Sequence, residues 1–120
     1  MINRKAALLE YKMSHRLMGV YQIRNTVKEK VWIDSSINVP AKFNRYRLQL
    51  AAGLHPSKAL QADWDEFGES AFAFEILEHL EPQDDPSYDY TSDLKIMKEI
   101  WMEKVEPYAD SGYNQRKKTT

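Results

Sequence analysis

A histidine at the expected start of a helix is a natural candidate for chemistry in this sequence. At such a position free backbone N–H groups and the helix dipole favour an anion beside His55. Its imidazole also titrates in the range that a general base needs. The helix expected just before it carries donors on one stripe, Lys42, Arg45 and Gln49, with Arg47 nearby. These groups could together hold a phosphate; the alternative is a structural or surface role for the histidine.

Two aromatic residues, Tyr21 and Trp32, lie in a predicted β-hairpin. The stretch GVYQIRN at 19–25 has the period-two pattern of a strand, and KVWID at 30–34 repeats it after a polar connector. The turn is expected at residues 25–29. Taken alone, this pattern predicts that both rings pack inside a sheet, as aromatic residues in strands usually do.

The remaining patterns indicate helices and a third strand around that hairpin. Helices are expected over 3–16, 40–53, 56–68 and 94–105. Ser92 or Asp93 is the expected cap of the last one. The run AFAFEILEHL alternates as a strand that would pair with the hairpin, and the acidic segment 81–93 reads as an exposed loop. One α+β domain over residues 1–120 is therefore predicted.

Composition limits the class of protein. The 120 residues include no cysteine, so disulfides and thiolate metal sites are excluded, and a cytoplasmic location without membrane attachment is expected. The net charge is −1, yet residues 1–60 hold 11 Lys or Arg against 3 Asp or Glu, and residues 61–120 hold 6 against 15. The halves thus carry +8 and −9. This asymmetry either creates a basic face or draws the two halves together.

The sequence lacks the common catalytic signatures. It contains no HExxH, Walker loop, GxSxG or dinucleotide fingerprint. The acidic loop lacks the glycine and the terminal glutamate of an EF-hand. The function must therefore be inferred from several weaker motifs and from their order along the chain.

The order of these motifs resembles that of the GIY-YIG endonuclease family, especially its bacterial and homing-endonuclease branches, across residues 17–114. The motifs that carry the resemblance are GVYQIRNT, LHPSKALQADWDEFGESAFAFEILE and the terminal GYN. Together they are far more specific than one tripeptide. The resemblance implies a small three-stranded antiparallel sheet flanked by helices, here with a lead-in helix at 1–16 and a basic tail at 115–120.

The resemblance also implies roles for individual residues. In this family one divalent metal ion assists phosphodiester cleavage, a tyrosine hydroxyl helps to activate water, an arginine steadies the phosphate and a glutamate holds the metal. Gly19, Val20 and Tyr21 match the first tripeptide, and Tyr21 would be its tyrosine. His55 matches a histidine near the site, and Asn114 matches the asparagine of the terminal GYN. An active member would act on DNA with Mg²⁺ or Mn²⁺.

The second tripeptide departs from the family pattern. Where the family has roughly Tyr-Ile-Gly, this chain has Trp32, Ile33 and Asp34. An indole cannot take a proton. Asp34 adds negative charge close to where phosphate would lie. The family arginine falls on Lys42, which keeps the charge but lacks the bidentate fork, and Arg45 one turn on could replace it.

The metal-ligand position departs as well. The family glutamate lies three residues before the aromatic residue of the last helix, and counting back from Trp101 gives Lys98. An ammonium there repels a divalent cation and could occupy its place. Glu99 is adjacent, but one residue rotates about 100° around a helix, so its side chain should point elsewhere. The metal ligands remain unassigned.

Three functions are compatible with these residues. The leading hypothesis is a nucleic-acid-binding protein, with DNA the expected partner, in which metal-dependent cleavage is lost or weakened and no cofactor is needed. Its binding residues would be Lys42, Arg45, Arg47 and Lys58, with His55 and the basic tail. The first alternative is an active DNA endonuclease with Glu99 or Glu75 as metal ligand and Arg45 as phosphate clamp. The second is a protein-interaction or regulatory module that uses the acidic loop.

Overall fold

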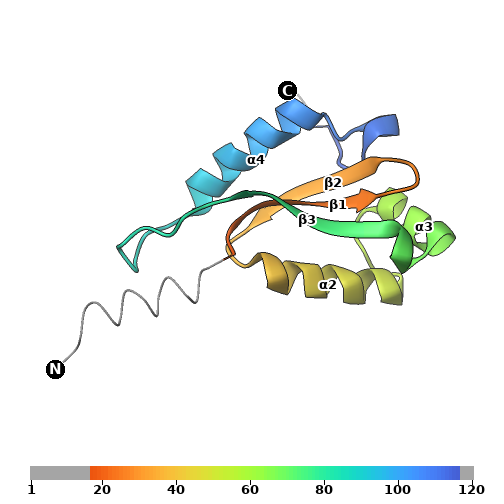
Figure 1. Cartoon of the computed structure of the whole chain (residues 1–120), viewed down its shortest axis with the longest axis horizontal. Helices are drawn as coiled ribbons and strands as arrows, with labels where there is room; N and C mark the ends of the chain where they lie inside the picture. The colour runs from red at the N-terminus through yellow and green to blue at the C-terminus, as the bar shows by residue number, and fades with distance from the viewer. Residues whose placement is uncertain (1–16, 117–120) are drawn as a thin grey trace.

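The computed structural model describes residues 17–116 and contains one small sheet with helices on both faces (Figure 1). Its elements in chain order are β1 (Gly19–Asn25), β2 (Lys30–Ser36), α2 (Val39–Ala52), α3 (Lys58–Phe67), the short 3₁₀ helix η1 (Glu69–Ala71), β3 (Phe72–His79), α4 (Thr91–Val105) and the 3₁₀ helix η2 (Ala109–Ser111). The helix expected over 3–16 and most of the basic tail lie outside the described residues. Within the described part, no helix is long and apolar enough to cross a membrane.

The sheet has the strand order β2-β1-β3, and both pairings are antiparallel. The α+β class and the three-stranded antiparallel sheet are thus confirmed. In the pairing of β1 with β2, Tyr21 lies opposite Asp34, and Ile23 lies opposite Trp32. The hairpin turn is held by Asn25, whose side-chain oxygen accepts the backbone N–H groups of Val27 at 2.9 Å and Lys28 at 3.1 Å. The strand β2 lies at the edge of the sheet, and its outer edge is not paired with another strand of the sheet.

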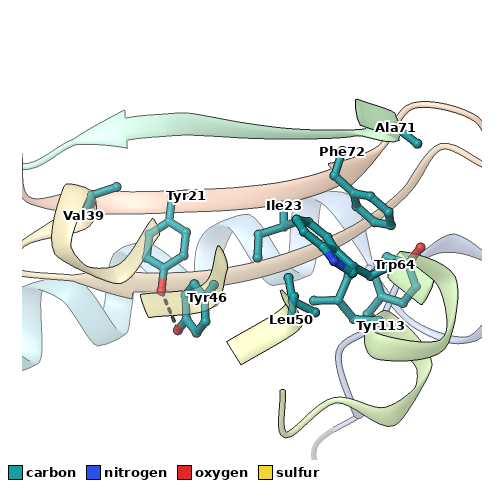
Figure 2. Close-up of a cluster of buried hydrophobic side chains, with 10 residues drawn as sticks. Tyr21, Ile23, Val39, Tyr46, Leu50, Trp64, Ala71, Phe72 and Tyr113 are labelled. Carbon is teal, nitrogen blue, oxygen red and sulfur yellow. Dashed lines mark hydrogen bonds between the residues drawn. The ribbon is translucent and has the colours of Figure 1, made fainter. Parts of the chain in front are cut away.

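Alternation along the strands divides the apolar side chains between two cores. On one face Tyr21 and Ile23 pack with α2 and α3 through Tyr46, Leu50 and Trp64 (Figure 2). On the other face α4 covers the sheet, and its partly buried apolar residues contact a buried cluster. That cluster is formed by Val20, Val31 and Ile33. The two-faced pattern predicted for β1 and β3 is therefore confirmed.

The helices α2 and α3 end at Gly53 and Gly68 as expected, but α3 begins at Lys58 rather than at residue 56, and α4 also begins at a different residue than expected. Asn38 caps α2, Ser57 caps α3 with its side chain accepting from the Leu60 N–H, and Gly53 ends α2 in a left-handed conformation. The predicted cap of the last helix at Ser92 or Asp93 is wrong, because α4 begins at Thr91. There the Asp89 carboxylate accepts from both the backbone N–H and the hydroxyl of Thr91, at 2.9 and 2.6 Å. An acidic residue ahead of the helix thus takes the role of the expected cap.

The acidic loop after β3 packs at one end of the sheet. Tyr90 is buried against Met18 and Leu94, and its hydroxyl accepts from the backbone N–H of Gln83 at 2.8 Å. Pro86 and Tyr88 of the loop line a small cavity of about 230 Å³ near the start of α4. These contacts place the loop beside α4.

The segment after α4 returns to the outer edge of β2. Gly112 forms a parallel bridge with Val31, and the Tyr113 N–H donates to the Val31 carbonyl at 2.9 Å. The Tyr113 hydroxyl donates to buried Asp63 at 2.7 Å and accepts from the Asn25 side-chain amide at 3.1 Å. This network ties the hairpin turn, α3 and the end of the chain together.

The glycine of the GVY motif has a structural explanation. Gly19 has φ +154°, next to a register shift between Val20 and Tyr21, and a Cβ there would overlap the carbonyl oxygen of Glu78. Gly53 also has a positive φ, of +76°, but a Cβ at that position would meet nothing within 4 Å. A side chain therefore adds a backbone collision at Gly19 and only conformational strain at Gly53.

We expect Gly19→Ala to destabilise the domain more than Gly53→Ala does. The second substitution should lower the free energy of unfolding by about 1 kcal/mol, the usual cost of a left-handed alanine. The first should cost more, because β1 and β3 must separate to admit the methyl group. Urea unfolding of both variants measures the difference, and equal losses would contradict the steric explanation.

Candidate functional site

A pair of buried tyrosines lies at the centre of the candidate site. Tyr21 on β1 is fully buried, and its hydroxyl lies 2.9 Å from the Tyr46 hydroxyl on α2 (Figure 2). Burial, followed by the hydrogen bond to Tyr46, raises the pKa of Tyr21, and burial likewise raises the pKa of Tyr46. Both phenols are therefore neutral at physiological pH. Tyr21 is present where the motif predicts it, but its hydroxyl is engaged with a second phenol.

Trp32 and His55 complete an aromatic cluster around these tyrosines. The Trp32 ring centroid lies 5.0 Å from that of Tyr46 and 5.3 Å from that of His55, in edge-to-face arrangements. It also lies 6.4 Å from the Tyr21 ring. The sequence predicted Tyr21 and His55 as neighbours only through the family resemblance, and the structure brings them into one cluster.

His55 is held in one tautomer by the turn before α3. Its Nδ1 accepts the backbone N–H of Ser57 at 3.0 Å, so the neutral ring carries its proton on Nε2. Among the described residues Nε2 is buried without a hydrogen-bond partner. Burial is the main cause that lowers the pKa of His55, against the opposing effect of the Ser57 hydrogen bond. The ring is therefore a neutral N–H donor in the folded domain.

A cleft of about 740 Å³ opens beside His55, between β2, the start of α3 and the C-terminal segment. Within residues 17–116, its lining includes Lys30 and Lys58 and contains no carboxylate. The Lys30 ammonium lies 4.8 Å from the Tyr113 ring centroid. Lys58, expected from the sequence to bind nucleic acid, is thus placed with His55 at a cationic cleft suited to an anion.

Two residues that depart from the family pattern lie together at the edge of β2. They are Asp34, in the second tripeptide, and Lys98, at the expected metal-ligand position. The Lys98 ammonium of α4 lies 3.1 Å from Asp34 Oδ1, and both side chains are partly exposed. Asp34 faces Tyr21 in the strand register. Its negative charge also contributes, after burial, to raising the pKa values of Tyr21 and Tyr46. The ion pair therefore borders the tyrosine pair.

Asn114 binds the backbone of β2 with both ends of its amide. Its oxygen accepts the Ile33 N–H at 2.8 Å, and its nitrogen donates to the Ile33 carbonyl at 2.8 Å. This arrangement extends the strand-like pairing of the preceding residues. Ile33 itself is buried on the α4 face. Asn114 thus fixes the strand that carries Trp32 and Asp34.

The basic residues of α2 do not form one cluster. Lys42 is half-buried and lies one turn before Tyr46, and Arg45 is exposed beside it. Arg47 lies apart from them, with its guanidinium 4.2 Å from the ring centroid of Phe74 on β3. Lys42 and Arg45 thus remain candidates near the tyrosines, whereas the Arg47 guanidinium lies over Phe74 of β3.

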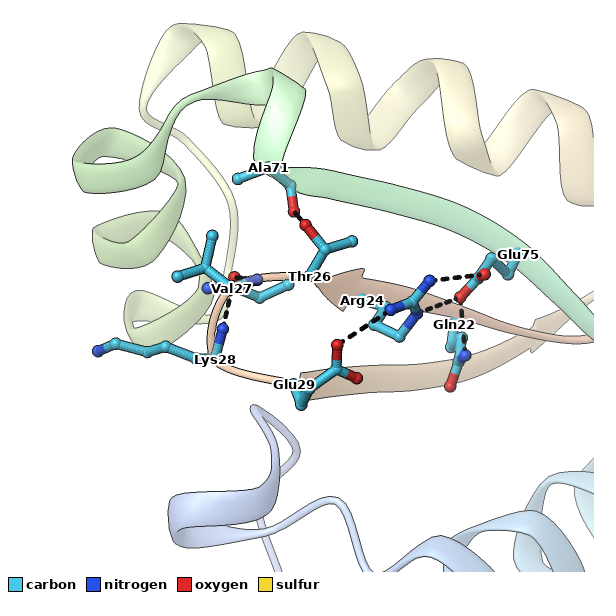
Figure 3. Close-up of polar contacts among 9 residues, drawn as sticks. Gln22, Arg24, Thr26, Val27, Lys28, Glu29, Ala71 and Glu75 are labelled. Atoms are coloured by element: carbon cyan, nitrogen blue, oxygen red, sulfur yellow. Dashed lines mark hydrogen bonds and ion pairs between the residues drawn. The ribbon is translucent and has the colours of Figure 1, made fainter.

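The described residues offer no ready metal site. Across residues 17–116 no group of three or more His, Cys, Asp or Glu side chains could hold a metal ion. Glu75 accepts from the Arg24 guanidinium at 2.8 and 3.2 Å and from Gln22 at 2.9 Å (Figure 3). Glu99 is exposed and lines a groove together with Lys98. Glu75 is therefore committed to an ion pair away from Tyr21.

Tyr46 is the site residue that the sequence analysis missed. It belongs to the apolar stripe with Phe43 and Leu50, so its periodicity predicts a core position, which is correct. Its hydroxyl was the available signal, because a buried tyrosine usually needs a hydrogen-bond partner. The partner, Tyr21, could not be identified without the packing of α2 on the sheet.

Comparison with known proteins agrees with this geometry. Over 97 residues the chain is 31% identical to Intron-associated endonuclease 1 of Enterobacteria phage T4, a match that covers 80% of this chain and 36% of the relative. The solved catalytic domain of homing endonuclease I-TevI superposes with a TM-score of 0.70 at 25% identity, covering 83% of this chain and 99% of that one. The chain is a member of the GIY-YIG endonuclease family.

A second structure of this GIY-YIG relative gives the same result. A glutamate-to-alanine variant of the catalytic domain of intron endonuclease I-TevI superposes with a TM-score of 0.67 at 26% identity, covering 81% of this chain and 91% of that one. No family model matches the sequence. The chain spans about a third of the length of the curated relative. The likeness to the GIY-YIG fold is therefore to a catalytic domain rather than to a whole nuclease.

The buried, neutral state of His55 predicts a pH-dependent stability. The unfolded histidine has a pKa of about 6.5, and the folded pKa is lower. As the pH falls through this value, the unfolded chain takes up a proton that the folded domain excludes. The free energy of unfolding should then fall by up to about 1.4 kcal/mol per pH unit, whereas the full stability is present above about pH 6.5.

Urea unfolding between about pH 7.5 and 5.5 tests this assignment. We expect His55→Gln to lose stability less steeply than wild type over this range. The matched control is His79→Gln, which changes an exposed side chain and should retain the wild-type dependence. Parallel curves for wild type and His55→Gln would contradict the assignment.

Proposed function

We propose that this chain is a GIY-YIG domain that binds nucleic acid, with DNA the expected partner, and has lost metal-dependent cleavage. The observation that carries the proposal is the ion pair between Lys98 and Asp34, with 3.1 Å between the ammonium and Oδ1. The family resemblance assigns the metal-binding glutamate to position 98 and a glycine to position 34. In this chain, position 98 holds a lysine and position 34 holds the aspartate that pairs with it.

The surrounding residues do not fit a divalent metal ion. A positive charge at Lys98 opposes a second cation, and Asp34 is neutralised by it. Among residues 17–116 no other cluster supplies the three ligands. Tyr21 also has a raised pKa and a hydroxyl bound to Tyr46, which makes it a poor proton acceptor. These side chains therefore supply neither the metal ligands nor the proton acceptor that metal-assisted cleavage would need.

Binding of nucleic acid is supported by the cleft beside His55. Lys30 and Lys58 line it, the described part of the chain places no carboxylate in the lining, and His55 and Trp32 form part of its wall. The α3 N-terminus at Ser57 adds backbone donors next to it. Phosphate oxygens are the ligands that lysines and helix N-termini commonly bind. Lys42 and Arg45 of α2 extend the positive charge toward the tyrosine pair.

An active endonuclease is the alternative. It is favoured by one observation, namely that Glu99 lines the same groove as Lys98 and could contribute to a rearranged site. In this alternative Glu99 would hold Mg²⁺ or Mn²⁺ and Arg45 would steady the phosphate. Glu75, the other candidate ligand, is held by Arg24 and Gln22.

Plasmid cleavage distinguishes the two functions. Supercoiled plasmid would be incubated with wild type, Lys98→Glu and the double variant Asp34→Gly/Lys98→Glu, each with magnesium, with manganese and with chelator. We expect no metal-dependent nicking by wild type, because the ammonium occupies the ligand position. Activity that appears only in variants with Glu at position 98 would show that the lysine prevents cleavage.

The control for this assay is Tyr21→Phe. Nicking by wild type that requires metal and disappears in Tyr21→Phe would contradict the loss of cleavage and establish the active alternative. Nicking that persists in Tyr21→Phe and in chelator would indicate a contaminating nuclease, and repurified protein should then be inactive.

Binding is tested separately by fluorescence anisotropy of a labelled oligonucleotide in chelator. The affinity should fall as salt rises from about 50 to 200 mM, because phosphate contacts release counterions. Lys58→Gln should weaken binding and reduce the salt slope by about one. Lys104→Gln, which removes a charge next to Trp101 on α4, is the matched control and should change the slope less. Absent or salt-independent binding would contradict the proposed function.

A further inference from the structure

We infer that Lys98 is a phosphate-binding residue whose anion site is occupied by Asp34 in the free domain. The ligand class is a phosphodiester of the nucleic-acid backbone, bound without metal, so this inference rests on the proposed function. In the free domain the Asp34 carboxylate contacts the Lys98 ammonium at 3.1 Å. A backbone phosphate would replace this carboxylate as the partner of the Lys98 ammonium, which moves away from Asp34 to meet it.

Lys98 is accessible to such a ligand. Its side chain is 36% exposed, and that of Asp34 is 29% exposed. Lys98 lines a groove of about 630 Å³ between α4 and the C-terminal segment. The same groove has Lys95 and Arg116 in its lining, and the carboxylates there are those of Glu99, Glu103 and Glu106. The charges of this lining balance, so a phosphate can approach the ammonium from the groove without entering a surface of net negative charge.

The ion pair is built so that it can open. Ion pairs that are this exposed contribute little to stability. The oxygen that contacts Lys98, Asp34 Oδ1, also accepts the backbone N–H of Ser35 at 2.8 Å, so the carboxylate keeps a hydrogen bond when the ammonium leaves. Asn114 holds the preceding residue, Ile33, through two hydrogen bonds. Asp34 is thus fixed by backbone contacts, and the long side chain of Lys98 is the partner that can move.

The groove and the cleft beside His55 are neighbouring hollows that share two lining residues. Asn114 and Gln115 line both of them, so the two lie on either side of the same short segment. A nucleic-acid backbone held at Lys58 in the cleft can pass this segment and reach Lys98 in the groove. The position of Lys98 therefore suits a second phosphate contact of one bound strand.

A double-mutant cycle tests the exchange. Binding of a labelled oligonucleotide would be measured in chelator for wild type, Asp34→Asn, Lys98→Met and the double variant. We expect Asp34→Asn to bind roughly threefold tighter or more, because the internal competitor is removed. Lys98→Met should bind more weakly. In the Lys98→Met background, Asp34→Asn should give only the small gain of a general charge change.

The control for charge is Asp85→Asn, which removes one exposed carboxylate from the loop after β3. Its gain sets the size of the general electrostatic effect. An equal gain from Asp34→Asn with and without Lys98 would overturn the exchange and leave only repulsion by Asp34. No gain above that of Asp85→Asn would overturn it too. Absence of binding in wild type and every variant would instead show that the proposed function fails. Urea unfolding confirms that each variant is folded.

Discussion

The pairing of β1 with a strand on each side determines the geometry of this domain. Because β1 is central, its alternating side chains reach both cores, with Tyr21 and Ile23 under α2 and Val20 under α4. The same pairing sets Tyr21 opposite Asp34. Close approach of β3 requires glycine at position 19. The GVY motif therefore has a folding role as well as the catalytic role implied by the family.

The outer edge of β2 depends on the end of the chain. An exposed strand edge carries unpaired backbone groups that must be satisfied. Tyr113 supplies a backbone N–H to Val31, and the Asn114 amide supplies a donor and an acceptor to Ile33. The side chain of Asn114 thus acts as a further strand residue. An intact GYN motif is explained by this edge closure even in a domain without catalysis.

Most of the fold could be predicted from local patterns, whereas the state of the site could not. Period-two alternation located the three strands, and Pro40 and Gly53 bracketed the basic helix. The pattern failed at the start of α3, which Ser57 caps, and at the start of α4, where Asp89 supplies hydrogen bonds ahead of the helix. The Tyr21–Tyr46 hydrogen bond and the Asp34–Lys98 ion pair join residues 25 and 64 positions apart. Contacts of this kind depend on how distant elements pack together, which local patterns in one sequence do not reveal.

The departures from the family pattern compensate one another in pairs. Lys98 alone would leave an unpaired cation at the edge of β2, and Asp34 alone would leave an unpaired anion beside two phenols. Together they neutralise each other at little cost, because both remain partly exposed. Trp32, which cannot accept a proton, packs edge-on against Tyr46, whose hydroxyl pairs with Tyr21. Each of these residues is thus satisfied by a neighbour, so the fold is compatible with the proposed replacement of the groups that a metal-dependent reaction would use.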